Sequence, residues 1–398
     1  MEYTFSSSMQ HFKSSAVRDI LKLTQGKSII SFAGGLPAEE LFPVEAIRSA
    51  FDRVFTHDNS ALQYGLTEGY TLLREALAER LSKRNIHVTK DEMLLTTGSQ
   101  QAIDLMSRVY IDPGDVVLVQ EPTYLAALQV FQSRGARIIS VKGDELGMDL
   151  EDAERLILIH KPKLVYINPT FSNPTGYVWS LERRLGILQV CRQHHVLILE
   201  DDPYGELQYG GSEHFPSIFS LDQHPHGSAV VYTSTFSKTV APALRTGWIV
   251  GDPQIITNMT RAKQAADLHS STMDQMALYQ LLCHFDLDKH VDTIRSEYER
   301  RMKKMATLLT GLNRSDIKWS EPKGGMFLWL ELPEGLVAEE LLKAAVQEGV
   351  AFVPGASFYA ESPKLNTLRL NFTHSNEKQI ELGMQYFAKA LEQCEARL

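Results

Sequence analysis

The sequence predicts an α/β fold in which helices flank a mostly parallel, seven-stranded sheet, with a smaller α+β domain attached. Three observations support this fold class. Short apolar runs alternate with helical stretches between about residues 90 and 285. These runs are apolar throughout, which is typical of strands that are buried on both faces of a parallel sheet. After about residue 285, charged amphipathic helices and alternating strands replace this pattern.

Seven apolar runs are the expected strands of the large sheet. Helical stretches between several of them, such as residues 181–193, fit crossover connections between parallel strands. The chain of 398 residues is long enough for two or three domains. The expected strands are residues 93–97, 115–119, 137–141, 164–167, 196–199, 229–232 and 246–251.

The C-terminal part of the chain predicts a second, smaller unit. Residues 290–309 form a long charged amphipathic helix pattern, and residues 327–332 alternate like a strand with one face in water. We expect further helices at residues 338–348 and 377–396 and a strand at residues 367–372. The predicted organisation is an N-terminal arm that forms part of the small domain (residues 1–45), a large ligand-binding domain (46–285) and a small C-terminal domain (286–398).

Composition argues against several classes of protein. The chain has 40 Lys and Arg residues against 49 Asp and Glu residues, a net charge of −9, whereas nucleic-acid-binding proteins usually carry a basic patch. The three cysteines form no C-x-x-C pair, and no histidine spacing indicates a metal site. Residues 1–13 lack the apolar core of a signal peptide, and no run reaches the roughly 18 apolar residues of a membrane span. We therefore expect a cytoplasmic protein with small-molecule ligands and no nucleic acid, membrane or metal partner.

A lysine, Lys238, follows shortly after the sixth expected strand, in a segment rich in Ser and Thr. Burial disfavours the charged form of an amine and makes it a nucleophile toward carbonyl groups. The hydroxyls of Thr235 and Ser237 could bind an anion such as phosphate beside it, and the guanidinium of Arg245 could add a bidentate contact. The alternative is a surface lysine in an ordinary turn.

A second candidate phosphate contact lies where the first expected strand passes into a helix, at Gly98, Ser99 and Gln100. Backbone N–H groups at a helix N-terminus bind phosphate with the help of the helix dipole. The alternative is that Ser99 only caps the helix. The segment contains neither G-x-G-x-x-G nor a Walker A pattern, so the sequence argues against a dinucleotide-dependent dehydrogenase.

Three consecutive acids, Glu200, Asp201 and Asp202, close the fifth expected strand, and Tyr204 follows them. The carboxyl ends of parallel strands face the crevice in which such sheets bind ligands. One of the acids could therefore hold a protonated ring nitrogen. The spacing does not choose between Asp201 and Asp202, and an acidic turn that ends at Pro203 is the alternative.

Three further positions carry chemistry that fits the same ligand. Asn173 lies in a turn after the fourth strand, Tyr124 after the second strand could stack on a flat ring, and Arg369 could bind a carboxylate with both arms of its guanidinium. The alternatives are a plain turn, a core tyrosine and an arginine that points to solvent. A nucleophilic lysine, two phosphate contacts, a stacking ring, an acid for a ring nitrogen and an arginine for a carboxylate together fit pyridoxal phosphate (PLP).

Eight short motifs occur in a fixed order: AGGLP at 33–37, LQYG at 62–65, TGSQQ at 97–101, NPTG at 173–176, EDDPY at 200–204, FSK at 236–238, LR at 244–245 and LRLN at 368–371. In this order and combination they are specific, although no single motif is. The sequence resembles the fold-type I, class I/II PLP-dependent aminotransferases along essentially its whole length. Within them it is most similar to the branch that holds 2-aminoadipate and kynurenine aminotransferases and related multi-substrate enzymes.

The resemblance implies roles for the residues that bind and activate the cofactor. Lys238 would bind PLP covalently and move the proton at the substrate α-carbon, and Asp201 would keep the ring nitrogen protonated. Asn173 and Tyr204 would bond the phenolic oxygen, with Asn173 also near the substrate carboxylate. Tyr124 would stack on the ring. The phosphate would be held by Ser99, Gln100, Ser237 and Arg245.

The resemblance also implies how the substrate is bound. Arg369 would pair with the α-carboxylate, and Gly35 and Leu36 would line the substrate side. Tyr64 would enter the site across a dimer interface, which predicts a homodimer with shared active sites. Arg18 is a candidate for binding the distal group of the substrate.

We therefore expect a PLP-dependent aminotransferase with a ping-pong cycle. An L-amino acid of the aromatic, 2-aminoadipate or branched-chain type would give its amino group to a 2-oxo acid, for which 2-oxoglutarate is the expected acceptor. One alternative is a PLP-dependent lyase, synthase or decarboxylase, because a fold does not fix a reaction. Another is a non-catalytic PLP-binding sensor of the kind fused to DNA-binding modules, which the acidic chain and the start of the motifs near residue 30 disfavour.

Overall fold

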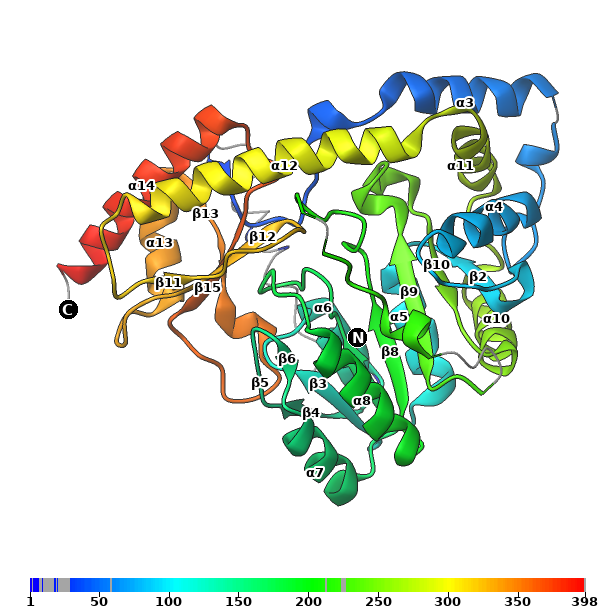
Figure 1. Cartoon of the computed structure of the whole chain (residues 1–398), viewed down its shortest axis with the longest axis horizontal. Helices are drawn as coiled ribbons and strands as arrows, with labels where there is room; N and C mark the ends of the chain where they lie inside the picture. Colours follow the sequence, from blue (N-terminus) through cyan, green and yellow to red (C-terminus); the bar gives the residue numbers. More distant parts are fainter. Residues whose placement is uncertain are drawn as a thin grey trace.

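Two sheets organise the chain. The computed structural model describes residues 29–57, 59–211, 213–222 and 227–396, together with residues 1, 3–6, 9, 18 and 20. A seven-stranded sheet forms the right-hand part of Figure 1 and a four-stranded sheet the left-hand part. The long helix α12 (Leu287–Thr310) runs along the top of both.

The seven-stranded sheet contains all seven expected strands, so the predicted fold class is confirmed. Its neighbouring strands are parallel except for β10, which is antiparallel to both β2 and β9. The strands in spatial order are β2 (Met93–Thr96), β10 (Gly247–Val250), β9 (Val230–Thr235), β8 (Leu197–Asp201), β7 (Leu164–Ile167), β3 (Val116–Gln120) and β4 (Arg137–Val141).

Helices cover both faces of this sheet, and this explains why its strands are apolar throughout. Alternate residues of a strand point to opposite faces. Val116 and Leu118 of β3 pack in one apolar cluster, whereas Val117 and Val119 pack in another. The first cluster includes α3 (Val44–His57), α4 (Thr71–Ser82), α7 (Leu150–His160), α8 (Leu181–Gln193) and α11 (Thr272–His284), and the second includes α5 (Ser99–Tyr110), α6 (Leu125–Ser133) and α10 (Pro253–Asp267).

The four-stranded sheet is antiparallel and carries helices α12, α13 (Ala338–Glu348) and α14 (Glu377–Glu395). The expectation that residues 327–332 have one face in water is wrong. Leu328 and Leu330 pack among these helices, while Trp329 on the opposite face packs edge-on against Phe358. The strands in spatial order are β11 (Lys318–Trp319), β12 (Phe327–Glu331), β15 (Thr367–Asn371) and β14 (Val353–Pro354).

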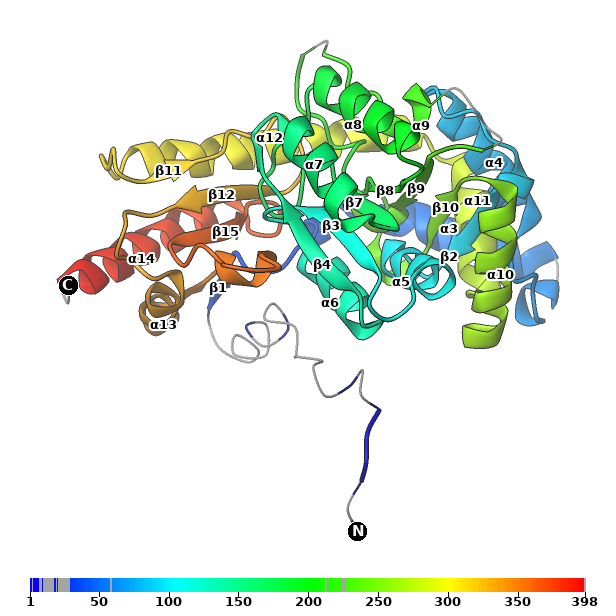
Figure 2. The same ribbon diagram turned by 90° about the horizontal axis from the view of Figure 1, so that it is seen from below.

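The start of the described chain joins this second part. Strand β1 (Ile30–Ser31) pairs in parallel with β13 (Val350–Ala351), which follows α13. Figure 2 shows β1 beneath the four-stranded sheet, close to β15. The three predicted domain ranges stay a prediction, and most of residues 1–28 lie outside the described residues.

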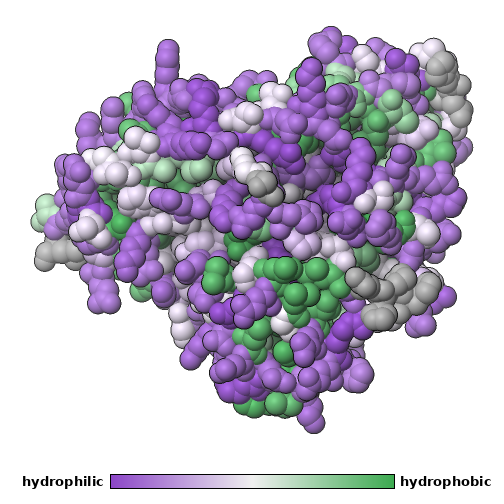
Figure 3. Space-filling model, in the orientation of Figure 1, coloured by the Kyte–Doolittle hydropathy of each residue, from purple (hydrophilic) through white to green (hydrophobic). Residues whose placement is uncertain are grey.

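None of the described helices has both the length and the apolar content that crossing a bilayer requires. Figure 3 shows a largely hydrophilic face with a hydrophobic area over α7 and α8. Exposed apolar side chains on these two helices are Leu158, Ile159, Leu181 and Leu185.

Candidate active site

One cavity of about 300 Å³ lies at the carboxyl edge of the seven-stranded sheet. This is the edge at which parallel α/β sheets bind ligands. Because β10 runs the opposite way, the segment that precedes it, which ends in Arg245, reaches the same edge. Eleven of the predicted site residues line this cavity: Gly35, Ser99, Gln100, Tyr124, Asn173, Asp201, Tyr204, Ser237, Lys238, Arg245 and Arg369.

Three predicted residues do not line the cavity of the single chain. Arg18 is exposed, and the side chain of Leu36 is also largely exposed. Tyr64 is 79% exposed and lies edge-on to His269, beside a different hollow. A residue contributed by a partner subunit would lie on the outside of one chain, so the expectation for Tyr64 stays a prediction.

Lys238 projects from the 3₁₀ turn Phe236–Lys238 that follows β9. Its Nζ donates a hydrogen bond to the carbonyl oxygen of Gly35 at 2.9 Å. Burial, together with the nearby cations Arg369 and Arg245, lowers the pKa of Lys238 to about 8, although Asp201 opposes the shift. The amine is therefore partly neutral near physiological pH, which a nucleophile toward carbonyl groups requires.

The three consecutive acids have three separate environments. Glu200 accepts hydrogen bonds from the backbone N–H groups of Ile218 and Phe219, at the start of α9 (Ile218–Leu221). Asp202 Oδ2 pairs with Arg84 and accepts a hydrogen bond from Tyr232, both at 2.9 Å. Only the remaining acid, Asp201, lines the cavity, so the structure separates two residues that spacing could not.

The carboxyl of Asp201 is held from behind. Its Oδ2 accepts a hydrogen bond from Tyr166 at 2.8 Å, and its Oδ1 is buried without a hydrogen-bond partner among the described residues. Burial raises the pKa of Asp201 to about 7, against the hydrogen bond from Tyr166, and the neighbouring Asp202 adds to the rise. Lys238 acts in the opposite direction. A cationic ring nitrogen beside Oδ1 would lower this pKa and keep the carboxyl charged.

The anion end of the cavity is built around Gly98. This residue is the N-cap of α5 and has a φ of +79°, so the alternative that Ser99 only caps the helix is wrong. Ser99 is the first residue of α5, and its hydroxyl is buried without a hydrogen-bond partner in the described part of the chain. Arg245 Nη2 donates to the carbonyl of Thr97 at 3.0 Å. If residue 98 carried a Cβ, that atom would lie only 2.7 Å from the same Nη2. A glycine therefore allows this arginine to approach the helix N-terminus.

Ser237 and Thr235 lie on the other side of this anion end. Their hydroxyl groups are 2.9 Å apart, and Thr235 Oγ1 also donates to the carbonyl of Thr246. Both residues line the cavity together with Ser99 and Arg245. The arrangement offers hydroxyl groups, a helix N-terminus and a guanidinium to one anion, which is the donor set that a phosphate requires.

Arg369 enters the cavity from β15 of the four-stranded sheet. It is only 2% exposed, so the alternative that it points to solvent is wrong. Its Nη1 donates to Asn173 Oδ1 and its Nη2 to the carbonyl of Ala33, both at 2.6 Å. Its guanidinium stacks 4.1 Å from the ring centroid of Phe327. Burial lowers the pKa of Arg369 to about 10, which leaves it a cation at neutral pH.

Two residues that support the site were not predicted from the sequence. Tyr166, within β7, holds Asp201, and nothing in an apolar strand distinguishes this tyrosine from a core residue. Asn168 lines the cavity and accepts a hydrogen bond from the backbone N–H of Asn173 at 2.7 Å. Its position directly after a buried strand, at the carboxyl edge, was the signal that could have identified it.

Comparisons with known proteins decide the family. A family model described as Aminotransferase class I and II matches residues 27–387. The chain belongs to this family. It is 40% identical over 399 residues to aromatic-amino-acid aminotransferase 1 of Thermococcus litoralis, with 98% of this chain and 95% of that protein covered.

Two solved structures show the same fold as this aminotransferase. One is the α-aminoadipate aminotransferase of Thermus thermophilus in complex with N-(5'-phosphopyridoxyl)-L-leucine, at 37% identity and a TM-score of 0.92, covering 99% of this chain and 98% of that one. The other is the kynurenine aminotransferase of Pyrococcus horikoshii, at 40% identity and a TM-score of 0.92, covering 98% and 97%. The resemblance seen in the sequence is therefore confirmed, and the chain is a PLP-dependent transaminase of fold type I.

The cavity fits PLP on its own chemistry. Three buried polar atoms that line it lack a hydrogen-bond partner among the described residues, and they are of three kinds: a hydroxyl of Ser99, a carboxylate oxygen of Asp201 and the Nε of Arg369. Buried polar groups in proteins are almost always hydrogen-bonded, so such atoms indicate a missing partner. The phosphate and the ring nitrogen of PLP would supply partners for Ser99 and Asp201, and the carboxylate of a substrate would supply one for Arg369.

The close approach at Gly98 predicts a specific defect in cofactor binding. Gly98→Ala should weaken PLP affinity about tenfold or more, because the added Cβ displaces Arg245. Gly114→Ala is the matched control, since Gly114 also has a positive φ of +91° but no heavy atom within 4 Å of an added Cβ. Both variants should lose about 1 kcal/mol of stability from backbone strain. Fluorescence titration of the cofactor-free proteins measures the affinity, and equal affinities in the two variants would contradict this account.

The pKa of Lys238 predicts how its reactivity depends on pH. In the cofactor-free protein, neutral amine is present above a pKa of about 8 and is lost as the pH falls below that value. The rate of its reaction with trinitrobenzenesulfonate should therefore rise about tenfold per pH unit up to pH 8 and then level off. Peptide mapping identifies the labelled residue, and Lys238→Arg supplies the background. A rate that still rises steeply at pH 10 would mean that the amine is not desolvated.

Proposed function

We propose that this aminotransferase transfers the amino group of an L-amino acid of the aromatic, 2-aminoadipate or branched-chain type to a 2-oxo acid, with 2-oxoglutarate as the acceptor, by a ping-pong cycle. The observation that carries the proposal is the cavity itself. Lys238, Asp201 and Arg369 converge there from both sheets, together with the anion end at Gly98. The related proteins named for aromatic amino acids, α-aminoadipate and kynurenine support the donor range.

Each side of the cavity has its own part in this proposal. Ser99, Gln100, Ser237 and Arg245 hold the phosphate, Asp201 holds the ring nitrogen, and Asn173 with Tyr204 holds the phenolic oxygen. Tyr124 stacks on the ring, and its hydroxyl donates to Gln100 at 3.2 Å, which fixes the plane of the side chain. When bound, PLP supplies an electron sink for the charge that develops at the substrate α-carbon.

The protein supplies orientation and proton transfer. Arg369 binds the α-carboxylate, and its rigid hydrogen bonds to Asn173 and Ala33 fix the direction from which the substrate enters. Lys238 Nζ removes the proton from the α-carbon and returns one in the second half of the cycle. With its lowered pKa, this amine can act both as a base and, once protonated, as an acid near neutral pH.

We further propose that the enzyme works as a homodimer in the cytoplasm. Apolar side chains around η2 (Asn59–Leu62) and the start of α11 are exposed in the single chain, and a partner subunit could cover them. They are Leu62, Tyr64, Leu66 and Met273. Exposed apolar side chains that belong to neighbouring elements are typical of protein interfaces. Tyr64 would then enter the partner's cavity. The buried Cys191 and the exposed Cys283 form no disulfide in the described chain, which fits a reducing compartment.

The half-reactions test the proposed function directly. The absorption spectrum of the purified holoenzyme is recorded before and after addition of single L-amino acids, without any oxo acid. A productive donor should convert the cofactor to the pyridoxamine form, and 2-oxoglutarate should restore the starting spectrum. Lys238→Ala should bind PLP without turning over. A cofactor band that no amino acid converts, or release of pyruvate or ammonia without an acceptor, would refute the proposal.

The neighbouring acids provide a matched pair of variants. Asp201→Asn should lower kcat about a hundredfold or more, because the ring nitrogen loses its charged partner. Asp202→Asn should leave kcat within about tenfold but cost about 2 kcal/mol of stability, since Arg84 loses its buried anion. Steady-state kinetics and thermal unfolding on the same preparations separate the two effects. Similar losses of kcat in both variants would contradict the assignment of Asp201.

A further inference from the structure

Residues 33–40, here called the cover segment, touch both charged groups that we assign to catalysis and substrate binding. The carbonyl of Ala33 accepts the hydrogen bond from Arg369 Nη2 at 2.6 Å. The carbonyl of Gly35 accepts the hydrogen bond from Lys238 Nζ at 2.9 Å. A displacement of this segment therefore changes the surroundings of the amine and of the arginine together.

The cover segment is attached to the part of the molecule built on the four-stranded sheet. Just before it, the backbone of Phe32 bonds to Ala351 and Asn371, at 2.7 and 2.8 Å. Within it, the carbonyl of Leu36 accepts from Thr373 Oγ1 at 2.8 Å, and the N–H of Ala38 donates to Tyr298 Oη at 3.0 Å. The amine of Lys238 comes from the other sheet, so the cover segment spans the two parts of the structure.

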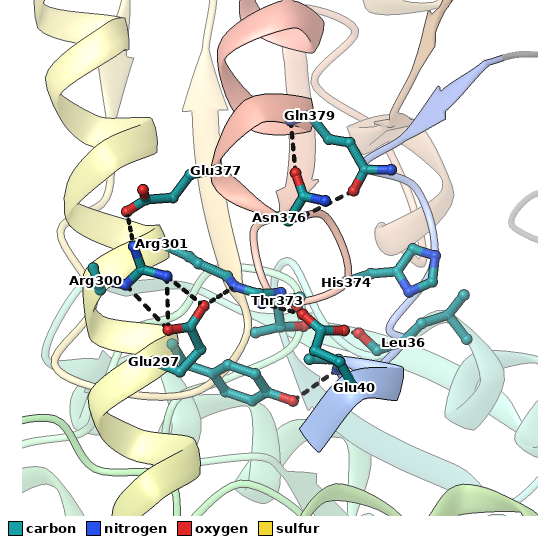
Figure 4. A network of polar contacts seen from close by, with 12 residues as sticks. Leu36, Glu40, Glu297, Arg300, Arg301, Thr373, His374, Asn376, Glu377 and Gln379 are labelled. Atoms are coloured by element: carbon teal, nitrogen blue, oxygen red, sulfur yellow. Dashed lines mark hydrogen bonds and ion pairs between the residues drawn. The ribbon is translucent and has the colours of Figure 1, made fainter. Parts of the chain in front are cut away.

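Arg301 of α12 fixes the far end of the cover segment. It is 2% exposed, and its guanidinium makes three contacts on three different pieces of chain. Its Nε donates to Glu297 on the same helix at 2.6 Å, its Nη1 to the carbonyl of Thr373 at 2.6 Å, and its Nη2 to Glu40. Figure 4 shows Glu40 reaching from the cover segment toward Arg301, with Thr373 and Leu36 close by.

The chemistry of this cluster requires an arginine and a carboxylate. A planar guanidinium can serve three acceptors in fixed directions, which a lysine ammonium on a flexible stem cannot reproduce. Burial is the largest single influence on the pKa of Glu40 and acts to raise it. The hydrogen bond and positive charge of Arg301, together with a backbone hydrogen bond, outweigh burial and leave the pKa below its ordinary value. Glu40 is therefore ionised at neutral pH, and its bond to Arg301 is charge-assisted.

We propose that Glu40 and Arg301 are positioning residues that hold the cover segment over the cavity and thereby set the affinity for the carboxylate substrates. The inference rests on the proposed roles of Lys238 and Arg369. Neither Glu40 nor Arg301 lines the cavity. They act through the carbonyl groups of Ala33 and Gly35. The groups that hold the cofactor phosphate and ring nitrogen belong to the seven-stranded sheet and its helices. Lys238 itself belongs to the turn after β9 and keeps its place without the cover segment, so cofactor affinity should depend little on this pair.

Glu40→Ala is the variant of choice, because the side chain of Glu40 is 53% exposed and its loss leaves Arg301 paired with Glu297. We expect KM for both the amino acid and the oxo acid to rise about tenfold, with kcat and PLP affinity within about twofold of the parent enzyme. The matched control is Arg300→Gln. Arg300 lies next to Arg301 and shares Glu297, but it is 55% exposed and its other ion pair is with Glu377. The control should leave KM unchanged.

A second measurement needs neither substrate nor cofactor. Amide hydrogen exchange in the cofactor-free protein should speed up across residues 33–40 in Glu40→Ala and in Arg301→Lys, but not in Arg300→Gln. Arg301→Lys keeps the positive charge but loses the planar guanidinium that serves three acceptors. It should therefore also loosen the cover segment and raise KM. Unchanged KM and unchanged exchange in Glu40→Ala would overturn the proposal. So would a loss of thermal stability with unchanged KM, because it would show a purely structural contact. If the parent enzyme fails to transaminate, the proposed function has failed, and the exchange experiment still decides the positioning of the segment.

Discussion

Removal of charged groups from water at one edge of a sheet is the constraint on which the rest of this structure depends. Lys238, Asp201 and Arg369 all line one cavity, and the removal of water there shifts each pKa in the direction that favours the neutral form of the group. Such groups are costly unless they are paired. Here the pairing is incomplete, because each wall of the cavity keeps one polar atom without a partner in the described chain. The ligand completes it, so binding energy comes largely from groups that are already placed.

The topology explains how so many polar groups reach one place without weakening the core. The strands are buried on both faces, and the polar side chains that reach the cavity from this sheet lie at or just beyond the ends of the strands. Parallel strands send those ends to the same edge. The antiparallel β10 adds the segment before it, with Arg245, to this edge as well. The four-stranded sheet contributes a single charged side chain, Arg369, and the cover segment connects it to Lys238.

The sequence predicted the large sheet well because its strands carry a strong signal. A run such as residues 164–167 is apolar on both faces and is bounded by turns, and few other structures produce that pattern. The prediction failed for residues 327–332, because alternation alone cannot show that a second layer covers the polar-looking face. The site was predicted mainly through motif order. Spacing alone did not separate Asp201 from Asp202, whereas the family resemblance did. Geometry was needed to find Tyr166, since a hydrogen bond between two strands leaves no trace in the spacing of either one.

The three adjacent acids at the end of β8 have separate roles, so the strand does not tolerate an insertion or a deletion. Asp201 points to one face and serves the cavity, while Glu200 and Asp202 point to the other and bind α9 and Arg84. An insertion or deletion of one residue would exchange the two faces. It would then remove the cavity acid, the anchor of α9 and the partner of Arg84 in a single event. Substitutions elsewhere around the cavity can change substrate preference one contact at a time. A change of register in β8 would alter all three acids at once. This strand should therefore be left intact in any redesign of the enzyme.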